Sequence, residues 1–468
     1  MKKTLFVISD LHLGGAPAVD GKPSFQMCSA AGQARLAQFI RHTAEQRSST
    51  VDVTLIIAGD IVDFLAEKEF TAFTIKDSLA GQKLSSIMRR TAEVWRSLQY
   101  FVSQGGQLVL LLGNHDIELS LPTPRRLLLE KLGPGRIEFI YDNQAYVDGP
   151  VIVEHGNRYD SWNVVSHDRL REVRSALSRG EEAPLFESPA GSLMVVNIMN
   201  GIKGRFPFVD LLKPEDASLL PLLAVLDPSS MSAATKAIAL WRRQSQVKFD
   251  DDGIPLDVQN IAHVGSKDEE LVALAMSLYG DNADIGAFDK IKDFFELWQL
   301  AHSENDKDEQ LRKLYVALHA RAESTWQTFD VNHETDVYKN PARASADRGF
   351  KVVVYGHTHL VKRLKLNDQG AVYLNSGTWA DLMQVPESVL MGDEEEGKRA
   401  LKSFVDDLVH NRLEAWRRQI ATFARIDLDD NGLTGADVYF FEGPHEIERV
   451  PDGPLQRLRH RQEAAARQ

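Results

Sequence analysis

The stretch that decides the fold is residues 4–15, TLFVISDLHLGG. Its first half is rich in apolar and β-branched residues and predicts a buried strand, which Asp10 and His12 follow directly. Alternate residues after a strand point the same way, so these two side chains can share one centre. Loops beyond strand ends are where α/β proteins build their sites. The stretch therefore predicts a strand that delivers two polar groups to a site.

Four later apolar runs end in polar residues of the same kind. They are VTLIIAGDIVD (53–63), LVLLLGNHD (108–116), VIVEHG (151–156) and VVVYGHTH (352–359). Helical spacing separates the early runs at Ala30–Gln46 and Ser85–Ser103, which predicts an α/β core with a sheet covered by helices. A single Asp-x-His or lone histidine is weak evidence for metal, but five such motifs in this order indicate a shared metal site.

Composition limits the remaining possibilities. The chain has 468 residues, 43% of them hydrophobic and 26% charged, which is typical of globular protein and long enough for one decorated domain or several domains. A net charge of -13 argues against bulk binding of nucleic acid. Cys28 is the only cysteine, so no intramolecular disulfide can form. Without a signal-peptide pattern or a long apolar run, we expect a cytoplasmic protein, with peripheral membrane contact weighed as an addition.

The order of patterns predicts a discontinuous core. Residues 1–160 and 349–385 form it, and 161–348 are read as an α-helical insertion or cap, because helical spacing dominates there and strand signals are scarce. Residues 386–448 are expected to supply a helix near Lys398–Phe423 and a hairpin near Arg425–Phe441 that pack on the core. The last segment, 449–468, is expected to be a disordered basic tail.

The motif set resembles the calcineurin-like metallophosphoesterase superfamily, over about 1–160 and 350–380. The shared elements are Asp-x-His, Gly-Asp-x-x-Asp, Gly-Asn-His-Asp, a single His-Gly and Gly-His-x-His. The resemblance implies a two-sheet β-sandwich flanked by helices, an α/β (α+β) fold, here with a large α-helical insertion. It also implies an enzyme that hydrolyses a phosphomonoester, phosphodiester or pyrophosphate bond by attack of a hydroxide that bridges two metal ions.

The resemblance assigns seven residues to two adjacent metals. The first ion would be held by Asp10, His12, Asp60 and His359, and the second by Asp60, Asn114, His155 and His357, with Asp60 shared. Mixed imidazole and carboxylate ligands suit manganese, iron, zinc or cobalt rather than calcium, and manganese is our first expectation.

The resemblance also suggests the catalytic groups. His115 would protonate the leaving oxygen or stabilise charge, with Asp116 orienting its imidazole. Asp63 is read either as a residue behind the ligands or as a helix N-cap. Arg158 is a candidate for binding a substrate phosphate, and a surface salt bridge is an equal alternative.

The sequence leaves the substrate open. Phe64-Leu65 stand where protein Ser/Thr phosphatases continue with Arg-Gly, which disfavours that branch. Enzymes that hydrolyse UDP-diacylglucosamine share the first motif but have Arg at the position of His115, so a pyrophosphatase acting on a lipid-linked substrate is an alternative. A non-catalytic scaffold on the same fold is a second alternative, disfavoured because every ligand position is filled.

The insertion raises one question about partners. Its runs Leu193–Val196, Phe206–Val209 and Leu219–Leu226 are unusually apolar, and Lys203, Arg205 and Lys213 lie beside them. Internal packing is the simpler interpretation. The alternative is a lid that admits a phosphorylated amphiphile at a membrane surface, rather than a phosphorylated small molecule.

Overall fold

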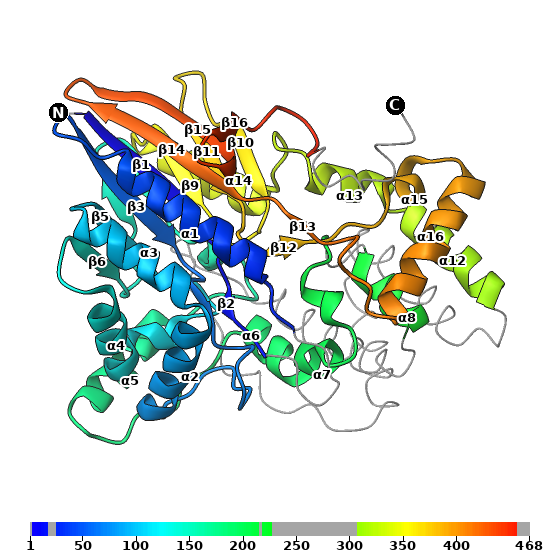
Figure 1. Cartoon of the computed structure of the whole chain (residues 1–468), viewed down its shortest axis with the longest axis horizontal. Helices are drawn as coiled ribbons and strands as arrows, with labels where there is room; N and C mark the ends of the chain where they lie inside the picture. Colours follow the sequence, from blue (N-terminus) through cyan, green and yellow to red (C-terminus); the bar gives the residue numbers. More distant parts are fainter. Residues whose placement is uncertain (1, 17–24, 215–217, 227–306, 456–468) are drawn as a thin grey trace, which may run out of the picture. The chain divides into compact units, whose positions relative to one another are not determined.

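The computed structural model describes residues 2–16, 25–214, 218–226 and 307–455 (Figure 1). The chain divides into two compact units. The first contains Met1–Val196, Gln327–Leu382 and Arg418–Arg457, and the second contains Asn197–Trp326, Met383–Arg417 and Leu458–Gln468. The domain boundaries expected from the sequence stay a prediction.

The larger sheet of the first unit has seven strands in the order β16-β15-β14-β1-β3-β5-β6. The strands β1, β3, β5 and β6 are parallel, and β14 to β16 extend the sheet in antiparallel fashion beyond β1. Their bounds are β1 (Lys2–Ile8), β3 (Val51–Ala58), β5 (Gln107–Leu111), β6 (Ile137–Ile140), β14 (Thr422–Asp429), β15 (Gly432–Gly443) and β16 (Glu446–Arg449).

The smaller sheet has five strands in the order β10-β11-β9-β8-β7, of which β11, β9 and β8 are parallel neighbours. Their bounds are β7 (Tyr146–Asp148), β8 (Val151–Val153), β9 (Val352–Tyr355), β10 (Val361–Lys365) and β11 (Val372–Ser376). Two short pairs complete the strands: β2 (Leu13–Gly14) with β4 (Val62–Asp63), and β12 (Asp381–Leu382) with β13 (Arg418–Gln419).

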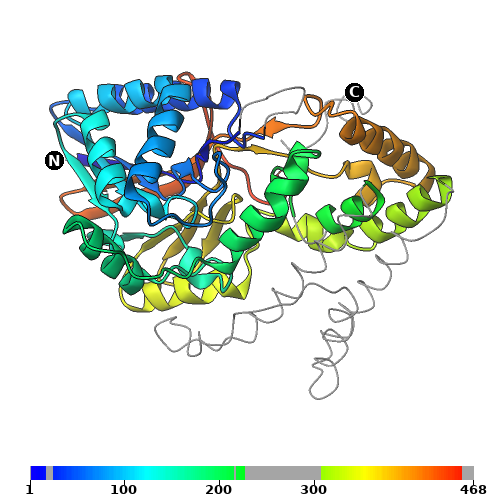
Figure 2. The same ribbon diagram turned by 90° about the horizontal axis from the view of Figure 1, so that it is seen from below.

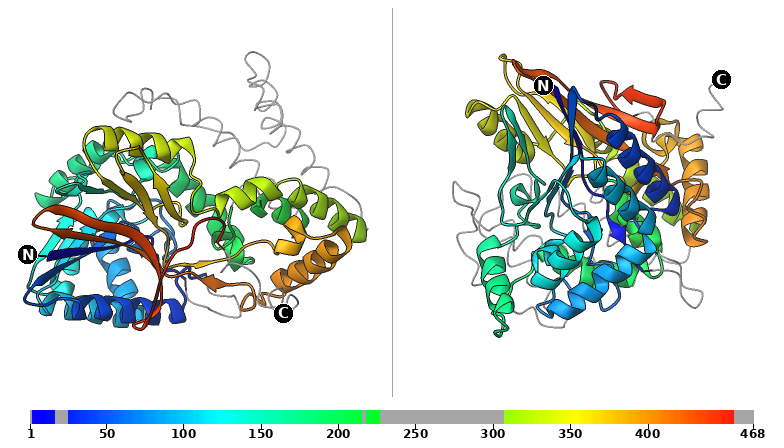
Figure 3. Two further views of the ribbon diagram at one scale, coloured as in Figure 1. Left: turned by 90° about the horizontal axis from the view of Figure 1, so that it is seen from above. Right: turned by 60° about the vertical axis from the view of Figure 1, so that its left-hand side comes forward.

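Helices cover both outer faces of the stacked sheets. The left view of Figure 3 shows α14 (Asp336–Asp347) over the smaller sheet and α1 (Ala30–Glu45) over the far face of the larger one. Phe39 of α1 packs against Trp379, Phe423 and Phe441, which fixes that helix to the sheet. The other helices of this unit are α2 (Asp77–Arg90), α3 (Ala92–Ser103), α4 (Pro122–Leu132), α5 (His167–Ser178), α6 (Ala190–Met194), and the short turns η1 (Ile117–Ser120) and η2 (Asn157–Tyr159).

The second unit, in its described part, is helical. Helix α12 (Lys307–His319) packs against α8 (Leu220–Leu226), α15 (Glu387–Met391) and α16 (Glu394–Val409), as Figure 2 shows for α12 and α16. It also contains α7 (Asn200–Lys203) and η4 (Pro207–Asp210); the remaining short helices of the chain are η3 (Val195–Met199) and α13 (Ala322–Thr328).

The predicted fold class is confirmed: sheets stacked on each other are flanked by helices, and each expected core strand is present. The helical runs Ala233–Val247, Asp268–Leu278 and Ile285–Ala301 lie outside the described residues, so the insertion as a whole stays a prediction. The run Ser85–Ser103 is not one helix, because α2 ends at Arg90 and α3 begins at Ala92.

The structure differs from the sequence-based expectations at two places in the C-terminal region. The helix expected at Lys398–Phe423 is α16, which begins at Glu394 and ends at Val409. It begins earlier than expected because the Asp393 side chain caps the amides of Glu395 and Glu396, and acidic residues suit a helix N-terminus. The expected disordered tail is ordered at its beginning, since Leu455 donates its amide to the Phe329 carbonyl; residues 456–468 lie outside the described part.

Candidate metal centre

The five motif loops meet at one edge of the stacked sheets. They follow the carboxyl ends of the parallel strands β1, β3, β5, β8 and β9, which point to the same edge. Backbone hydrogen bonds join the first two loops: the Asp10 amide donates to the Gly59 carbonyl at 3.1 Å, and the His12 amide donates to the Asp60 carbonyl at 3.0 Å. Sheet topology, rather than sequence proximity, brings these residues together.

Backbone strain is concentrated in the same loops. Among the described residues, eight non-glycine residues have positive φ, a conformation that L-residues rarely adopt. Five of the eight are predicted ligands: Asp10, His12, Asp60, His357 and His359, with φ between 43° and 70°. Strain of this kind persists only where the surrounding structure imposes it, and it gathers at functional sites.

Two motif glycines allow the carboxylates to approach the backbone. A Cβ atom at Gly113 would lie 2.0 Å from Asp60 Oδ1, and one at Gly356 would lie 2.7 Å from Asp10 Oδ2. Both distances are shorter than any contact a methyl group could make. Glycine is therefore required at these positions by packing against the site.

The first group of predicted ligands comprises Asp10, His12 and His359. His12 Nε2 lies 3.0 Å from His359 Nε2, and Asp10 Oδ1 lies 3.4 Å from His359 Nε2 and 3.9 Å from His12 Nε2. Neighbouring ligand atoms bound at about 2.1 Å in tetrahedral geometry would be about 3.4 Å apart. The observed separations match the spacing of atoms that surround one small cation.

The second group comprises Asp60, His155 and His357. Asp60 Oδ2 lies 3.3 Å from His155 Nε2 and also 3.8 Å from His12 Nε2 of the first group. The other oxygen, Oδ1, accepts the amide of His115 at 2.9 Å. Asp60 is thus the residue whose carboxylate faces both groups.

Buried polar atoms without hydrogen-bond partners test whether cations fit here. Asp10 Oδ1, His12 Nδ1, Asn114 Oδ1 and His155 Nε2 are buried and accept no hydrogen bond from any described residue. His155 Nδ1 meets the Ala58 carbonyl at 2.7 Å and therefore carries a proton, which leaves Nε2 as the nitrogen that can face a cation. Buried polar atoms without partners are costly unless a cation or an ordered water satisfies them. The donor set of oxygen and imidazole nitrogen suits divalent transition-metal ions.

Electrostatics favour the metal-binding protonation states of two key groups. Burial lowers the pKa of His12 to about 4, with His115 adding to the shift, so its imidazole is neutral near pH 7. Burial opposes ionisation of Asp60, but His155, His115 and His12 outweigh it and hold the pKa of Asp60 well below its usual value. A neutral imidazole and an ionised carboxylate are the forms that bind cations.

His115 lies beside the first group, its ring 4.8 Å from the ring of His12. Its Nδ1 contacts Asp63 Oδ1 at 3.2 Å, so Asp63 is the carboxylate that orients this imidazole. The expectation that Asp116 does so was wrong. Both Asp116 oxygens accept backbone amides, from Ile61 and Gly113, each at 2.7 Å, which ties two ligand loops together.

Asp116 is fully buried in that position. Burial, with a contribution from the nearby Asp60, raises the pKa of Asp116 to about 7. The hydrogen bonds from the Ile61 and Gly113 amides nevertheless make it a structural acceptor that joins the loops. The sequence motif Gly-Asn-His-Asp could not distinguish this role from contact with the adjacent imidazole.

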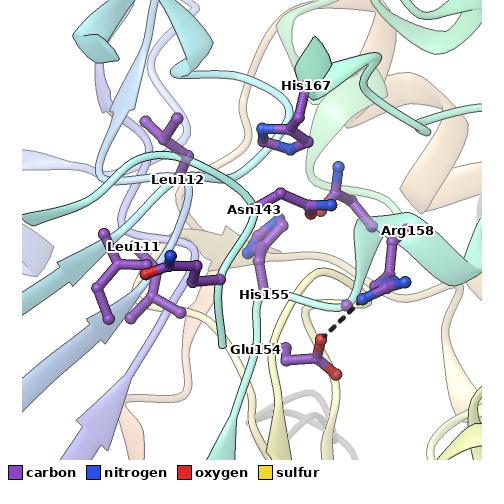
Figure 4. A pocket seen from close by; sticks show the side chains of 11 residues that line it. Leu111, Leu112, Asn143, Glu154, His155, Arg158 and His167 are labelled. Carbon is purple, nitrogen blue, oxygen red and sulfur yellow. Dashed lines mark hydrogen bonds and ion pairs between the residues drawn. The ribbon is translucent and has the colours of Figure 1, made fainter. Parts of the chain in front are cut away.

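Arg158 lies outside the two ligand groups. Its guanidinium pairs with Glu154 Oε1 at 3.4 Å, and its side chain is 38% exposed. Figure 4 shows this pair among the side chains that line a pocket, together with His155, His167 and Asn143. The salt bridge expected as the alternative is thus present, and a role for Arg158 in substrate binding stays a prediction.

Two residues near Arg158 that sequence reasoning missed contact predicted ligands. Asp160 Oδ2 lies 3.0 Å from His357 Nε2, and Asn163 Oδ1 accepts Asn114 Nδ2 at 3.2 Å. Both follow His155 within the same short segment. The only sequence signal for Asp160 and Asn163 is the high proportion of polar residues after His155. Among those residues, charge favours Arg158 as the candidate for binding phosphate.

The apolar runs of the second unit are largely buried. Phe208, Val209, Leu222 and Leu223 have almost no exposed surface. Lys203, which lies beside these runs, is buried and forms an ion pair with Asp210 at 2.5 Å. Contact with an amphiphile or a membrane surface stays a prediction. In the described part of the chain, no helix has the length and apolar character needed to cross a bilayer.

Comparison with known proteins identifies the class. Residues 3–196 match the family model described as calcineurin-like phosphoesterase. The match supports a calcineurin-like metallophosphoesterase assignment for residues 3–196, as the motifs in that part of the chain predict. A search of curated proteins found no match. Family and clustered His and Asp side chains together support a metal-dependent phosphoesterase in general terms.

Proposed function

We propose that this protein hydrolyses a phosphomonoester, phosphodiester or pyrophosphate bond at a two-metal site formed by Asp10, His12, Asp60, Asn114, His155, His357 and His359. The observation that carries the proposal is that side chains from distant loops gather around Asp60, whose carboxylate faces both ligand groups, and that several buried polar atoms there have no hydrogen-bond partner among the described residues. Two bound cations would supply Lewis acidity, which neutralises phosphoryl charge and lowers the pKa of the attacking water.

The protein's own residues supply positioning and proton transfer. Asp60 faces both ligand groups, and the His115 amide holds its second oxygen. Asp63 holds Nδ1 of His115, which directs Nε2 of the imidazole away from that carboxylate. A histidine oriented in this way can donate a proton to the departing oxygen, the contribution expected of a general acid.

A substrate panel tests the proposal. The purified full chain, supplied with Mn²⁺, is assayed against aryl monoesters, aryl diesters, nucleotide sugars and lipid phosphates. We expect metal-dependent hydrolysis of at least one class, abolished by a chelator and restored by Mn²⁺. The class that reacts fastest identifies the bond, and hydrolysis confined to lipid-linked pyrophosphates would favour the UDP-diacylglucosamine-hydrolase-like alternative. Metal binding without turnover on any class would contradict the enzymatic proposal and favour a scaffold.

A further inference from the structure

One short segment, residues 155–163, contains one predicted ligand of the second ion, His155, and contacts the other three: Asp60, Asn114 and His357. His155 is itself the first residue of this segment. Asp160 contacts His357, and Asn163 contacts Asn114, although these two partners lie on loops from different sheets. A single stretch of chain therefore meets three ligands that arrive from separate parts of the sequence.

Asp160 holds the imidazole of His357 in one orientation. Its Oδ2 lies 3.0 Å from His357 Nε2 and accepts Asn163 Nδ2 at 2.7 Å, while its Oδ1 accepts the Trp162 amide at 3.0 Å. Three donors on two oxygens leave the carboxylate little freedom to rotate. Because Nε2 of His357 is used by Asp160, Nδ1 is the nitrogen left to meet a cation.

Asn163 fixes the amide of Asn114 in the corresponding way. Its Oδ1 accepts Asn114 Nδ2 at 3.2 Å, which fixes the plane of the Asn114 amide and leaves Asn114 Oδ1 buried, without a hydrogen bond from described residues. Asn163 is itself well anchored: its amide donates to the Asp160 carbonyl at 2.9 Å, and its carbonyl accepts Asn157 Nδ2 at 2.8 Å. The surroundings are tight, since a Cβ at Gly191 would lie 2.2 Å from Asn163 Oδ1.

We propose that Asp160 and Asn163 are positioning residues for the second cation site, which set its affinity by orienting His357 and Asn114. The inference rests on the proposed two-metal function. Within the described structure, neither residue makes a hydrogen bond to Asp10 or His12 of the first group. Loss of either residue should therefore weaken one ion and spare the other. Partners behind metal ligands are typically worth about 10–100-fold in metal affinity.

The test measures Mn²⁺ binding to the metal-stripped full chain by calorimetry, with electron paramagnetic resonance to separate coupled ion pairs from single ions. The variants are Asp160→Ala, Asn163→Ala and the conservative Asp160→Asn, which keeps an acceptor for His357. The control is Asp406→Asn, which alters another aspartate–histidine contact, 3.2 Å from His410 Nδ1 on an exposed helix end. Circular dichroism and thermal melting confirm that each variant is folded.

We expect Asp160→Ala and Asn163→Ala to bind the second ion about 10–100-fold more weakly, with the first ion unchanged and the single-ion signal replacing the coupled one. Asp160→Asn should lie between wild type and alanine, and Asp406→Asn should match wild type. Folded alanine variants that keep two ions at wild-type affinity, or that lose both ions equally, would overturn the inference and leave the proposed function intact. A wild-type chain that binds fewer than two ions would overturn both.

Discussion

The two halves of the candidate metal centre are held in place by different means. Asp10, His12 and His359 all lie in strained positive-φ conformations, and Asp10 is fixed through its carbonyl, which accepts the Thr378 hydroxyl at 2.7 Å and the Trp379 amide at 3.2 Å. Asn114 and His155 have ordinary backbone conformations and are oriented through their side chains. His357 shares the positive φ of the first half, and its imidazole is also held by Asp160. The first half thus depends on backbone geometry, and the second depends in addition on polar neighbours.

This difference in support explains which parts of the metal centre can be recognised from sequence spacing. Backbone-held ligands must be close in sequence, as in Asp-x-His and His-x-His, because one strained turn presents both. Side-chain-held ligands can be supported by any residue that folding brings near, so their supports carry no fixed spacing. Substitutions should consequently separate the two halves, and the following ones are ordered from the largest expected effect to the smallest.

Asp60→Asn should erase the distinction between the halves, because Asp60 Oδ2 lies near both His155 and His12. An amide removes the shared negative charge and one acceptor. We expect the affinity for both ions to fall by more than the about 10–100-fold that is typical when a residue behind a ligand is lost. Activity should fall with the loss of the ions. Metal content by plasma mass spectrometry after dialysis checks this; retention of two ions would contradict the bridging position of Asp60.

His115→Ala should leave both halves intact and remove proton transfer. Its side chain is outside the ligand groups assigned to the ions, and general acid catalysis contributes typically about 10²–10⁴-fold. We expect kcat to fall within that range while the chain still binds two ions. An unchanged kcat on a substrate with a poor leaving group would remove His115 from the mechanism.

Asp63→Asn is the graded companion to that variant. The contact of Asp63 Oδ1 with His115 Nδ1 orients the ring without touching substrate. We expect a fall in kcat smaller than that of His115→Ala, with KM little changed and the acidic or basic limb of the pH–rate profile displaced. A double variant no worse than His115→Ala would show that the two residues act together; fully additive losses would refute the coupling.

Thr378→Val should weaken the first half of the metal centre and leave the second half unchanged. The buried Thr378 hydroxyl donates to the Asp10 carbonyl, and its loss leaves that carbonyl with one fewer partner, a cost of about 1 kcal/mol. We expect the first ion to bind several-fold more weakly and the second to be unaffected, the reverse of Asp160→Ala. Calorimetry with Mn²⁺ resolves the two sites, and selective loss of the second ion would contradict the assignment of the halves.

Glu118→Gln should alter stability rather than metal binding. Glu118 is fully buried on η1, and burial raises its pKa to about 8, although Lys83 opposes the shift. Between the unfolded and the folded pKa, Glu118 is protonated in the folded chain and ionised in the unfolded chain. Wild-type stability therefore declines as the pH rises through this interval. The variant lacks this penalty. Its melting temperature relative to wild type should rise between about pH 5 and about pH 9, and a constant difference would contradict the shift.

The sequence was sufficient for the framework and for the convergence of the ligands. Apolar runs that end in Asp60 or His155 have the length and composition of buried strands, and parallel strands bring their carboxyl ends to one edge. Long-range pairing of these strands then follows from the fold class. No contact between distant side chains was needed to predict this much.

Contacts between side chains were not available from the sequence. Asp116 is adjacent to His115 and was chosen to orient it, but the chain turns so that Asp116 faces two backbone amides and Asp63 faces the imidazole. Asp160 and Asn163 were overlooked because their ligand partners lie far away along the chain. Rotamers and loop paths decide such contacts, and spacing does not specify them.

The most direct test of the central claim is a crystal structure of the full chain grown with Mn²⁺, with diffraction recorded at the manganese absorption edge. The account predicts two anomalous peaks about 3.5–4 Å apart, one on either side of Asp60, the first next to Asp10, His12 and His359 and the second next to Asn114, His155 and His357. A single peak, or manganese bound away from Asp60, would contradict it.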